Sequence, residues 1–281
     1  TLFNATFPAY PSLTLSASTA NLTIWFPRGA SYVISSLEAK GVASTNTTQG
    51  AFRIFSYTPK SNLTEFADEP AWFSFSASAD TFKIIEVNEV RRDISLEGYE
   101  SLFISDSYQI ISKSSDLSKI GLLLPSGAYG VTAMGIWGQI PSDRLTITSS
   151  NVTITFSPAL SRGSEGRFTL NYILPWKDHV NTQTWSNFYV NLTLFDNDSW
   201  IIRKWTTTVT LPEGATLLSQ PPSTNLNSLT QSAYQTTLIF VFYNATPFQN
   251  VTFNFTFGYT VFWESFRPTL WMGATVTVVA V

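Results

Sequence analysis

The sequence predicts an all-β protein of two antiparallel β-sandwich domains in tandem, and three observations predict it. Of the 281 residues, 15% are aromatic and only 12% are charged, which is about half the usual charged share of ~25%. Thr, Ser, Asn, Val and Phe dominate, and these residues favour strands over helices. Short apolar runs alternate with Gly, Pro, Asn and Ser turn signals, as is typical of β-sandwiches.

The clearest strand-and-turn signal is Trp205–Ala215, WTTTVTLPEGA. Its β-branched residues suit a strand, Pro212 removes a backbone donor, and Gly214 permits a turn with positive φ. Leu22–Ala30 (LTIWFPRGA) and Ile120–Ala128 (IGLLLPSGA) repeat the same order. The three copies indicate either a repeated module or the strand–Pro–x–Gly turn common to β proteins. Both interpretations give the same fold class.

The first domain is predicted over residues 1–84. Its strand candidates are Leu13–Ser18, Leu22–Phe26, Ala51–Tyr57 and Ala71–Ser76. The Ser/Thr/Asn/Gly-rich segment Gly41–Gly50 is predicted to be a loop, and the polar segment Ser61–Glu69 a short helical turn. The pattern restarts near Asp80–Ile84, which sets the domain boundary.

The second domain is predicted over residues 85–265. Its strand candidates are Glu86–Ser95, Ser101–Ile111 with a partner strand from Ile120, Leu145–Phe156, Arg167–Leu174, Phe188–Phe195, Trp200–Leu211, Thr236–Asn244 and Asn250–Phe262. Glu97-Gly98 and Asp196–Ser199 are predicted turns, and Ser219–Ser232 is a predicted loop. The last two strands are expected to form a hairpin around Pro247.

The tail, residues 266–281, differs from the rest. A cluster of aromatic residues and one Arg lies at the start of a charge-free run, Thr269–Val281: Trp263, Phe266, Arg267 and Trp271. Aromatic residues and Arg before such a run are typical of the membrane interface, although the run is shorter than the about 20 residues that span a bilayer. We expect either the start of a membrane anchor, which we favour, or a terminal exposed strand over Ala274–Val281.

Ten Asn-x-Ser/Thr sequons indicate an N-glycosylated chain on the extracytoplasmic face of a membrane or at the cell surface. The candidate glycosylation sites are Asn4, Asn21, Asn46, Asn62, Asn151, Asn191, Asn197, Asn244, Asn250 and Asn254. The sequence has no Cys, which excludes thiol catalysis, but a secreted domain of this size needs no disulfide. A first residue other than Met fits a processed precursor.

Nothing in the sequence predicts a catalytic residue, a metal site or a cofactor other than covalent N-glycans. His179 is the only His, and its neighbour Asp178 points away from it in an extended chain, so we expect a solvated loop residue. Asp196–Ser199 offers oxygen ligands without EF-hand spacing, which favours a simple turn. The net charge of −3 and the lack of a basic run exclude nucleic acid as a partner.

Tryptophans form the other candidate site, because their rings can line a carbohydrate-binding surface. We expect most of them in the core instead, since sandwich cores use Trp routinely. The six considered are Trp25, Trp72, Trp137, Trp176, Trp185 and Trp200.

Residues 81–281 resemble, in order, the second lumenal domain of the ribophorin I family. The resemblance is carried by Thr81–Ser115, the LLLPSGAYGVTAM segment, Phe168–Pro175 (FTLNYILP), Asn191–Phe195 and Trp205–Ala215. Ribophorin I is a non-catalytic subunit of oligosaccharyltransferase. The resemblance implies two extracytoplasmic β-sandwich domains, a following transmembrane helix and no active-site residues. Residues 1–80 are shorter than the family's first domain, and the sequon count exceeds the family's.

Two functions remain open at this point. The first is an accessory membrane subunit in a glycosyltransferase complex, with other protein subunits as partners and the membrane reached through the C-terminus. The alternative is a structural cell-surface glycoprotein of a surface layer, sheath or filament, which assembles with copies of itself through β-strand contacts. A carbohydrate hydrolase is a distant third, since no pair of carboxylates stands out.

Overall fold

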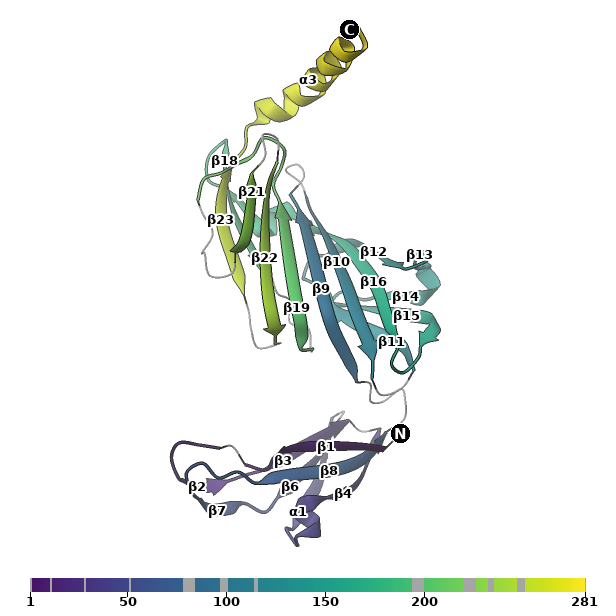
Figure 1. The fold of residues 1–281 in the computed structure, drawn as a ribbon, viewed down its shortest axis with the longest axis vertical. Helices are drawn as coiled ribbons and strands as arrows, with labels where there is room; N and C mark the ends of the chain where they lie inside the picture. The colour runs from purple at the N-terminus through teal and green to yellow at the C-terminus, as the bar shows by residue number, and fades with distance from the viewer. Residues whose placement is uncertain are drawn as a thin grey trace. The chain divides into compact units, whose positions relative to one another are not determined.

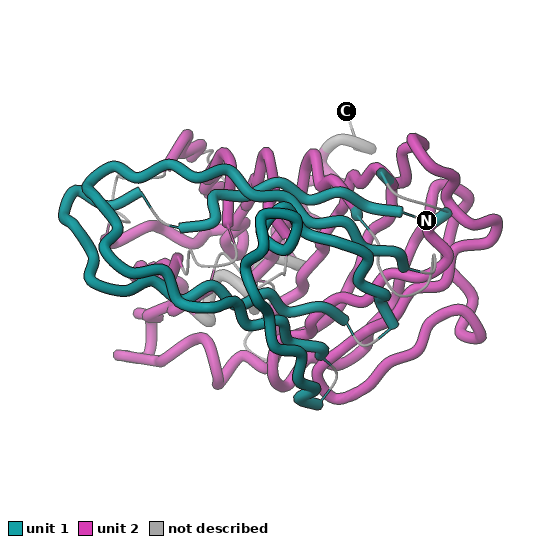
Figure 2. Tube along the Cα trace, turned by 90° about the horizontal axis from the view of Figure 1, so that it is seen from below, with its two compact units in different colours: residues 1–84, 113–116 teal, residues 85–112, 117–281 magenta. Residues whose placement is uncertain are grey.

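The computed structural model describes residues 2–10, 12–27, 29–50, 52–77, 84–96, 101–113, 116–193, 200–219, 226–231, 235–246 and 251–280. The chain divides into two compact units, unit 1 (residues 1–84 with 113–116) and unit 2 (residues 85–112 with 117–281), which Figure 2 colours separately. Strands make up most of both units (Figure 1). The predicted all-β, sandwich-like fold class is therefore confirmed.

Unit 1 consists of three small sheets, with strand orders β1-β8-β4, β3-β6-β5 and β2-β7. Its elements are β1 (Leu2–Pro8), β2 (Ala17–Ala20), β3 (Thr23–Pro27), β4 (Ala30–Ser35), α1 (Ser36–Ala39), β5 (Ser44–Gln49), β6 (Phe52–Tyr57), β7 (Lys60–Leu63) and β8 (Pro70–Ala77). Phe26 lies at the centre of the core. Its ring centroid is 5.5 Å from that of Phe55, 4.9 Å from Phe73 and 5.4 Å from Phe75. Aromatic packing between two sheets thus holds this unit together.

Three predictions for unit 1 are wrong. Of the predicted strand Leu13–Ser18, only Ala17 and Ser18 lie in a strand, β2. The predicted loop Gly41–Gly50 contains strand β5, and Ser61–Glu69 begins within strand β7 rather than a helical turn. Both strands lie at sheet edges and are mostly exposed. Edge strands need no apolar face, so their composition resembles that of a loop.

Unit 2 is a sandwich whose first layer is an eight-stranded sheet, in the order β13-β12-β16-β10-β9-β19-β22-β21. The strands of this layer are β9 (Ile85–Ser95), β10 (Ser101–Ser112), β12 (Tyr129–Gly135), β13 (Gly138–Gln139), β16 (Glu165–Pro175), β19 (Ile202–Thr210), β21 (Leu226–Gln231) and β22 (Thr236–Ala245). The described strands of this sheet pair antiparallel, except that β9 and β19 pair in parallel.

The second layer consists of two smaller sheets, β11-β15-β14 and β17-β18-β23-β20. Their strands are β11 (Leu117–Leu123), β14 (Leu145–Ile147), β15 (Asn151–Leu160), β17 (Val180–Thr182), β18 (Asn187–Thr193), β20 (Thr216–Leu217) and β23 (Thr252–Gly258). Three helical segments complete the unit: η1 (Ser142–Arg144), α2 (Trp176–His179) and α3 (Val261–Ala280).

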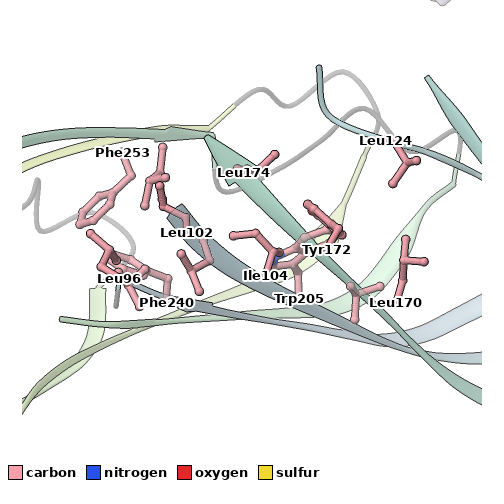
Figure 3. Close-up of a cluster of buried hydrophobic side chains, with 14 of the residues drawn as sticks. Leu96, Leu102, Ile104, Leu124, Leu170, Tyr172, Leu174, Trp205, Phe240 and Phe253 are labelled. Carbon is pink, nitrogen blue, oxygen red and sulfur yellow. The ribbon is translucent and has the colours of Figure 1, made fainter. Parts of the chain in front are cut away.

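The core of unit 2 lies between these layers. Figure 3 shows Leu102, Trp205 and Phe240 of the large sheet in this cluster, together with Phe253 of β23. Along β10, buried residues alternate with more exposed ones, which is the period of a strand with one face in the core. The outward face of the large sheet therefore remains accessible to solvent.

A charged pair is buried in the mainly apolar core of unit 2. Arg92 and Asp106 are 4% and 1% exposed and lie opposite each other on β9 and β10. Arg92 donates from Nε to Oδ1 of Asp106 at 2.7 Å and from Nη2 to Oδ2 at 2.8 Å. The Tyr172 hydroxyl donates to the same Oδ2 at 3.0 Å, and the guanidinium lies 5.2 Å from the ring centroid of Trp205. The network joins four neighbouring strands, β16, β10, β9 and β19.

Several predicted strand pairings are wrong. Strands β22 and β23 form no hairpin, because β22 pairs with β19 and β21 whereas β23 pairs with β18 and β20. Likewise β11 pairs with β15 and not with β10. The predicted loop Ser219–Ser232 contains β21. The predicted turns Glu97-Gly98 and Asp196–Ser199 lie outside the described residues.

The Pro–x–Gly–Ala motif forms the same turn in the two copies that lie wholly within the described residues. Gly127 and Gly214 have φ of 80° and 78°. In both, the Ala N–H donates to the Pro carbonyl, Ala128 to Pro125 at 3.2 Å and Ala215 to Pro212 at 3.0 Å. Glycine therefore occupies the third position of the turn, where φ is positive in type II turns. The predicted conformation of Gly214 is confirmed.

Replacing Gly214 by Val is expected to destabilise unit 2 by about 1–2 kcal/mol, because a β-branched residue resists the left-handed backbone. Thermal melting of the full chain measures the effect. Gly214→Asn is the matched control, since Asn tolerates this conformation, and its loss should be smaller. Equal melting of the Val variant and the wild type would contradict the assignment.

The C-terminal segment is the helix α3, so the alternative of a terminal strand over Ala274–Val281 is wrong for the described residues up to Ala280. The helix begins at Val261, before the predicted start of the tail at residue 266. No helix in the described part of the chain is both long and apolar enough to cross a membrane.

Candidate glycosylation sites

Eight of the ten sequon asparagines lie in the described part of the chain, and all eight are exposed. They are Asn4, Asn21, Asn46, Asn62, Asn151, Asn191, Asn244 and Asn254. Asn197 and Asn250 lie outside the described residues. Other described asparagines behave differently: Asn88, Asn171 and Asn187 are half-buried, whereas Asn181 and Asn227 are exposed. Exposure is therefore more frequent among the described sequon asparagines than among the other five.

The acceptor hydroxyls are also accessible. Each of the eight asparagines is followed two residues later by Thr, and none of these threonines is buried. Where the sequon lies in a strand, both side chains point to the same face, since side chains alternate with a period of two. An enzyme that modifies these amides can therefore reach both recognition groups from the solvent side.

In unit 1, three sequons lie on strands at sheet edges. Asn4 is on β1, Asn46 on β5 and Asn62 on β7, and each of these strands ends its sheet. An edge strand exposes unpaired backbone groups to which another chain can add. A glycan at each position would block that addition.

In unit 2, three sequons lie on the outer face of the second layer. Asn191 of β18 and Asn254 of β23 are direct cross-strand partners, so their side chains share one face. Asn151 opens β15 and precedes the fully buried Val152, so it points away from the core. The fourth, Asn244, lies near the end of β22 with φ of 52°, a left-handed conformation that Asn tolerates.

The catalytic candidates are not brought together. His179 ends α2, and its Nε2 is shielded from solvent without a hydrogen-bond partner, so the predicted solvated side chain is wrong. No bond between His179 and Asp178 occurs among the described contacts. The described residues contain no group of three or more His, Cys, Asp or Glu side chains that could hold a metal ion. Asp196–Ser199 lies outside the described residues.

The tryptophans contradict the expectation that most lie in the core. Trp25, Trp72, Trp137 and Trp185 are 53%, 40%, 92% and 67% exposed, whereas Trp176 is buried and Trp200 half-buried. The composition around a Trp in a strand or turn is the same whether its side chain faces the core or the solvent. The register of the strand decides which of the two it faces.

Comparison with known proteins identifies no family for this chain. No family model matches it, and no curated protein matches it. Among solved structures, it is similar to an M1 zinc metallopeptidase from Deinococcus radiodurans, with 19% identity and a TM-score of 0.41 over 62% of this chain and 42% of that chain. It is also similar to an aminopeptidase A from Legionella pneumophila, with 10% identity and a TM-score of 0.43 over 62% of this chain and 21% of that one. The chain thus spans less than half the length of these structures, and at these scores the likeness assigns it no function.

Proposed function

We propose that this protein is a non-catalytic, N-glycosylated, extracytoplasmic β-sandwich protein that acts by contact with other protein subunits. The observation that carries the proposal is the exposure of all eight described sequon asparagines, against two of the five other described asparagines. An exposed asparagine can carry a glycan without disturbing the core. N-glycans are added to extracytoplasmic surfaces, where these asparagines would carry them.

The first candidate role is that of an accessory subunit in a glycosyltransferase complex, as the resemblance to ribophorin I implies. Three of the four glycans on described sequons of unit 2 would lie on the second layer, and the fourth, on Asn244, would lie near the end of β22. Most of the outer face of the large sheet would stay bare. On that face, Lys204 pairs with Glu89 at 2.8 Å and Arg91 with Asp93 at 3.1 Å. A bare polar face of this kind suits contact with another subunit.

The helix α3 supports attachment to an apolar environment, and we propose a membrane or a membrane-embedded subunit as its partner. Phe266, Trp271 and Met272 are 57%, 60% and 67% exposed. The hydroxyls of Thr275 and Thr277 donate to backbone carbonyls four residues earlier, at 2.7 and 2.8 Å. These bonds satisfy the hydroxyls without water, as in helices that lie in lipid.

A self-assembling surface glycoprotein is the second candidate role, and one feature of unit 2 favours it. Strand β21, LNSLTQ, ends the eight-stranded sheet and carries neither charge nor Pro. Such an edge lacks the usual protection against pairing with another chain. Electron microscopy of the purified native protein distinguishes the roles: a defined complex with other subunits supports the first, and a lattice or fibre of this chain the second.

Glycopeptide mass spectrometry tests the shared part of both roles. We expect glycans at Asn191 and Asn254 in the native protein. Thr193→Ala should remove the glycan from Asn191 while leaving that residue in place, whereas Thr193→Ser should retain it. Unmodified asparagines at all eight described positions would overturn the proposal.

A further inference from the structure

The hairpin between β12 and β13 has an unusual tip. Gly135 pairs with Gly138, which leaves Ile136 and Trp137 as a two-residue connection, 70% and 92% exposed. The positive φ of this turn falls on Gly138, at 110°, so its two central positions are open to most residues. The exposed Ile-Trp pair contributes nothing to the core and offers apolar and aromatic surface to a ligand.

A groove lies beside this tip. It is lined by the hairpin, by the end of β15 and by the start of β16, and has a volume of about 510 Å³, within the usual range of ligand sites. Apolar side chains in the lining include Ile140, Phe156 and Leu160. The sequon Asn151 lies at the opposite end of β15, roughly 17 Å from Phe156 along the strand, so its glycan leaves the groove open.

The charged side chains in the lining are Arg144, Glu165 and Arg167. Arg144 of η1 makes no side-chain hydrogen bond or ion pair within the described part of the chain, and it is half-buried. Arg167 pairs with Glu165 at 2.7 Å, and this guanidinium lowers the pKa of Glu165, which keeps the pair neutral overall. Arg144 therefore leaves the groove with one uncompensated positive charge, although the whole chain carries a net charge of −3.

We propose that this groove binds an acidic oligosaccharide, with the Trp137 indole stacked on one sugar ring and Arg144 paired with an acidic group of a neighbouring ring. A sugar ring has an apolar C–H face and a rim of hydroxyls. The exposed indole matches the face, and the Glu165–Arg167 pair and Gln139 offer acceptors and donors to the hydroxyls. The guanidinium binds a carboxylate or sulfate through two parallel hydrogen bonds. An apolar peptide would leave Arg144 without a partner, and a membrane surface would require more than one free cation.

A glycan array of acidic and neutral oligosaccharides, probed with the full chain, tests the proposal. We expect binding to acidic members. The best acidic ligand is then titrated alongside its uncharged counterpart, carboxyl-methylated or desulfated. Trp137→Ala should weaken binding of both by about tenfold or more. Arg144→Gln should weaken binding of the acidic ligand by about tenfold while leaving the uncharged one unchanged.

Trp185→Ala is the matched control, because Trp185 is 67% exposed and does not line the groove. It should bind as the wild type does, and unchanged thermal melting of all three variants excludes unfolding as the cause. The proposal is overturned if no oligosaccharide binds or if Trp137→Ala binds normally. It is equally overturned if Trp137 proves necessary for binding peptides or phosphatidylglycerol vesicles instead. None of these outcomes depends on whether the sequons are occupied.

Discussion

Asp106→Asn is expected to destabilise unit 2 by about 3–5 kcal/mol, because it leaves the Arg92 guanidinium charged and buried without its counter-ion. Arg92 is 4% exposed, so water cannot replace the lost carboxylate. Tyr172 also loses a charged acceptor for its hydroxyl. Chemical unfolding of the full chain, followed by circular dichroism, should show a lower denaturant midpoint for unit 2.

Asp93→Asn is the control for this prediction. Asp93 lies on the same strand as Arg92 and pairs with Arg91 at 3.1 Å, but both side chains are exposed, at 41% and 60%. An exposed pair contributes about 0–1 kcal/mol, so this variant should unfold nearly as the wild type does. Equal losses of stability in Asp106→Asn and Asp93→Asn would show that burial of the ion pair does not determine the destabilisation.

The double variant Arg92→Met with Asp106→Leu separates pairing from packing. Replacing both partners of a buried ion pair by apolar residues is often neutral or stabilising. We expect the double variant to recover most of the stability lost in Asp106→Asn. If the double variant is less stable than Asp106→Asn, the attraction within the ion pair stabilises the fold by more than the desolvation of its two charges costs.

The second large effect is expected at Phe240, where substitution by Ala should cost about 3–5 kcal/mol. Phe240 is 1% exposed, and its ring lies 4.4 Å from that of Phe253 in the opposite layer. Truncation therefore opens a cavity between the two layers of the sandwich. The unfolding transition of unit 2 again measures the loss.

Phe103→Ala is the matched control for Phe240, because it removes the same side chain from the outer face of the same sheet. Phe103 is 44% exposed, so its truncation leaves no enclosed cavity and should cost less than about 1 kcal/mol. A loss at Phe103 as large as that at Phe240 would mean that the outer face is covered in solution.

The sequence predicted many of the strands but not how they pair. Strands β6, β9 and β16 lie within about two residues of their predicted ranges, because alternation and turn residues are local signals. The predicted pairing partners of β11 and β23 were wrong, because a turn signal marks where the chain reverses and not which layer of the sandwich it enters next. The positive φ of Gly214 was predictable for the same local reason, because a Pro–x–Gly turn requires positive φ at its glycine.

The sequence by itself determined the fold class, the turn at Gly214 and the positions of the ten sequons, because each depends on residues that are close along the chain. Only the tertiary structure decided that Arg92 meets Asp106, that Asn191 lies opposite Asn254, and that Trp137 points into solvent beside a groove. These relations join residues from separate strands. They follow from register and layer packing, which are set by burial of the whole core and not by any one segment.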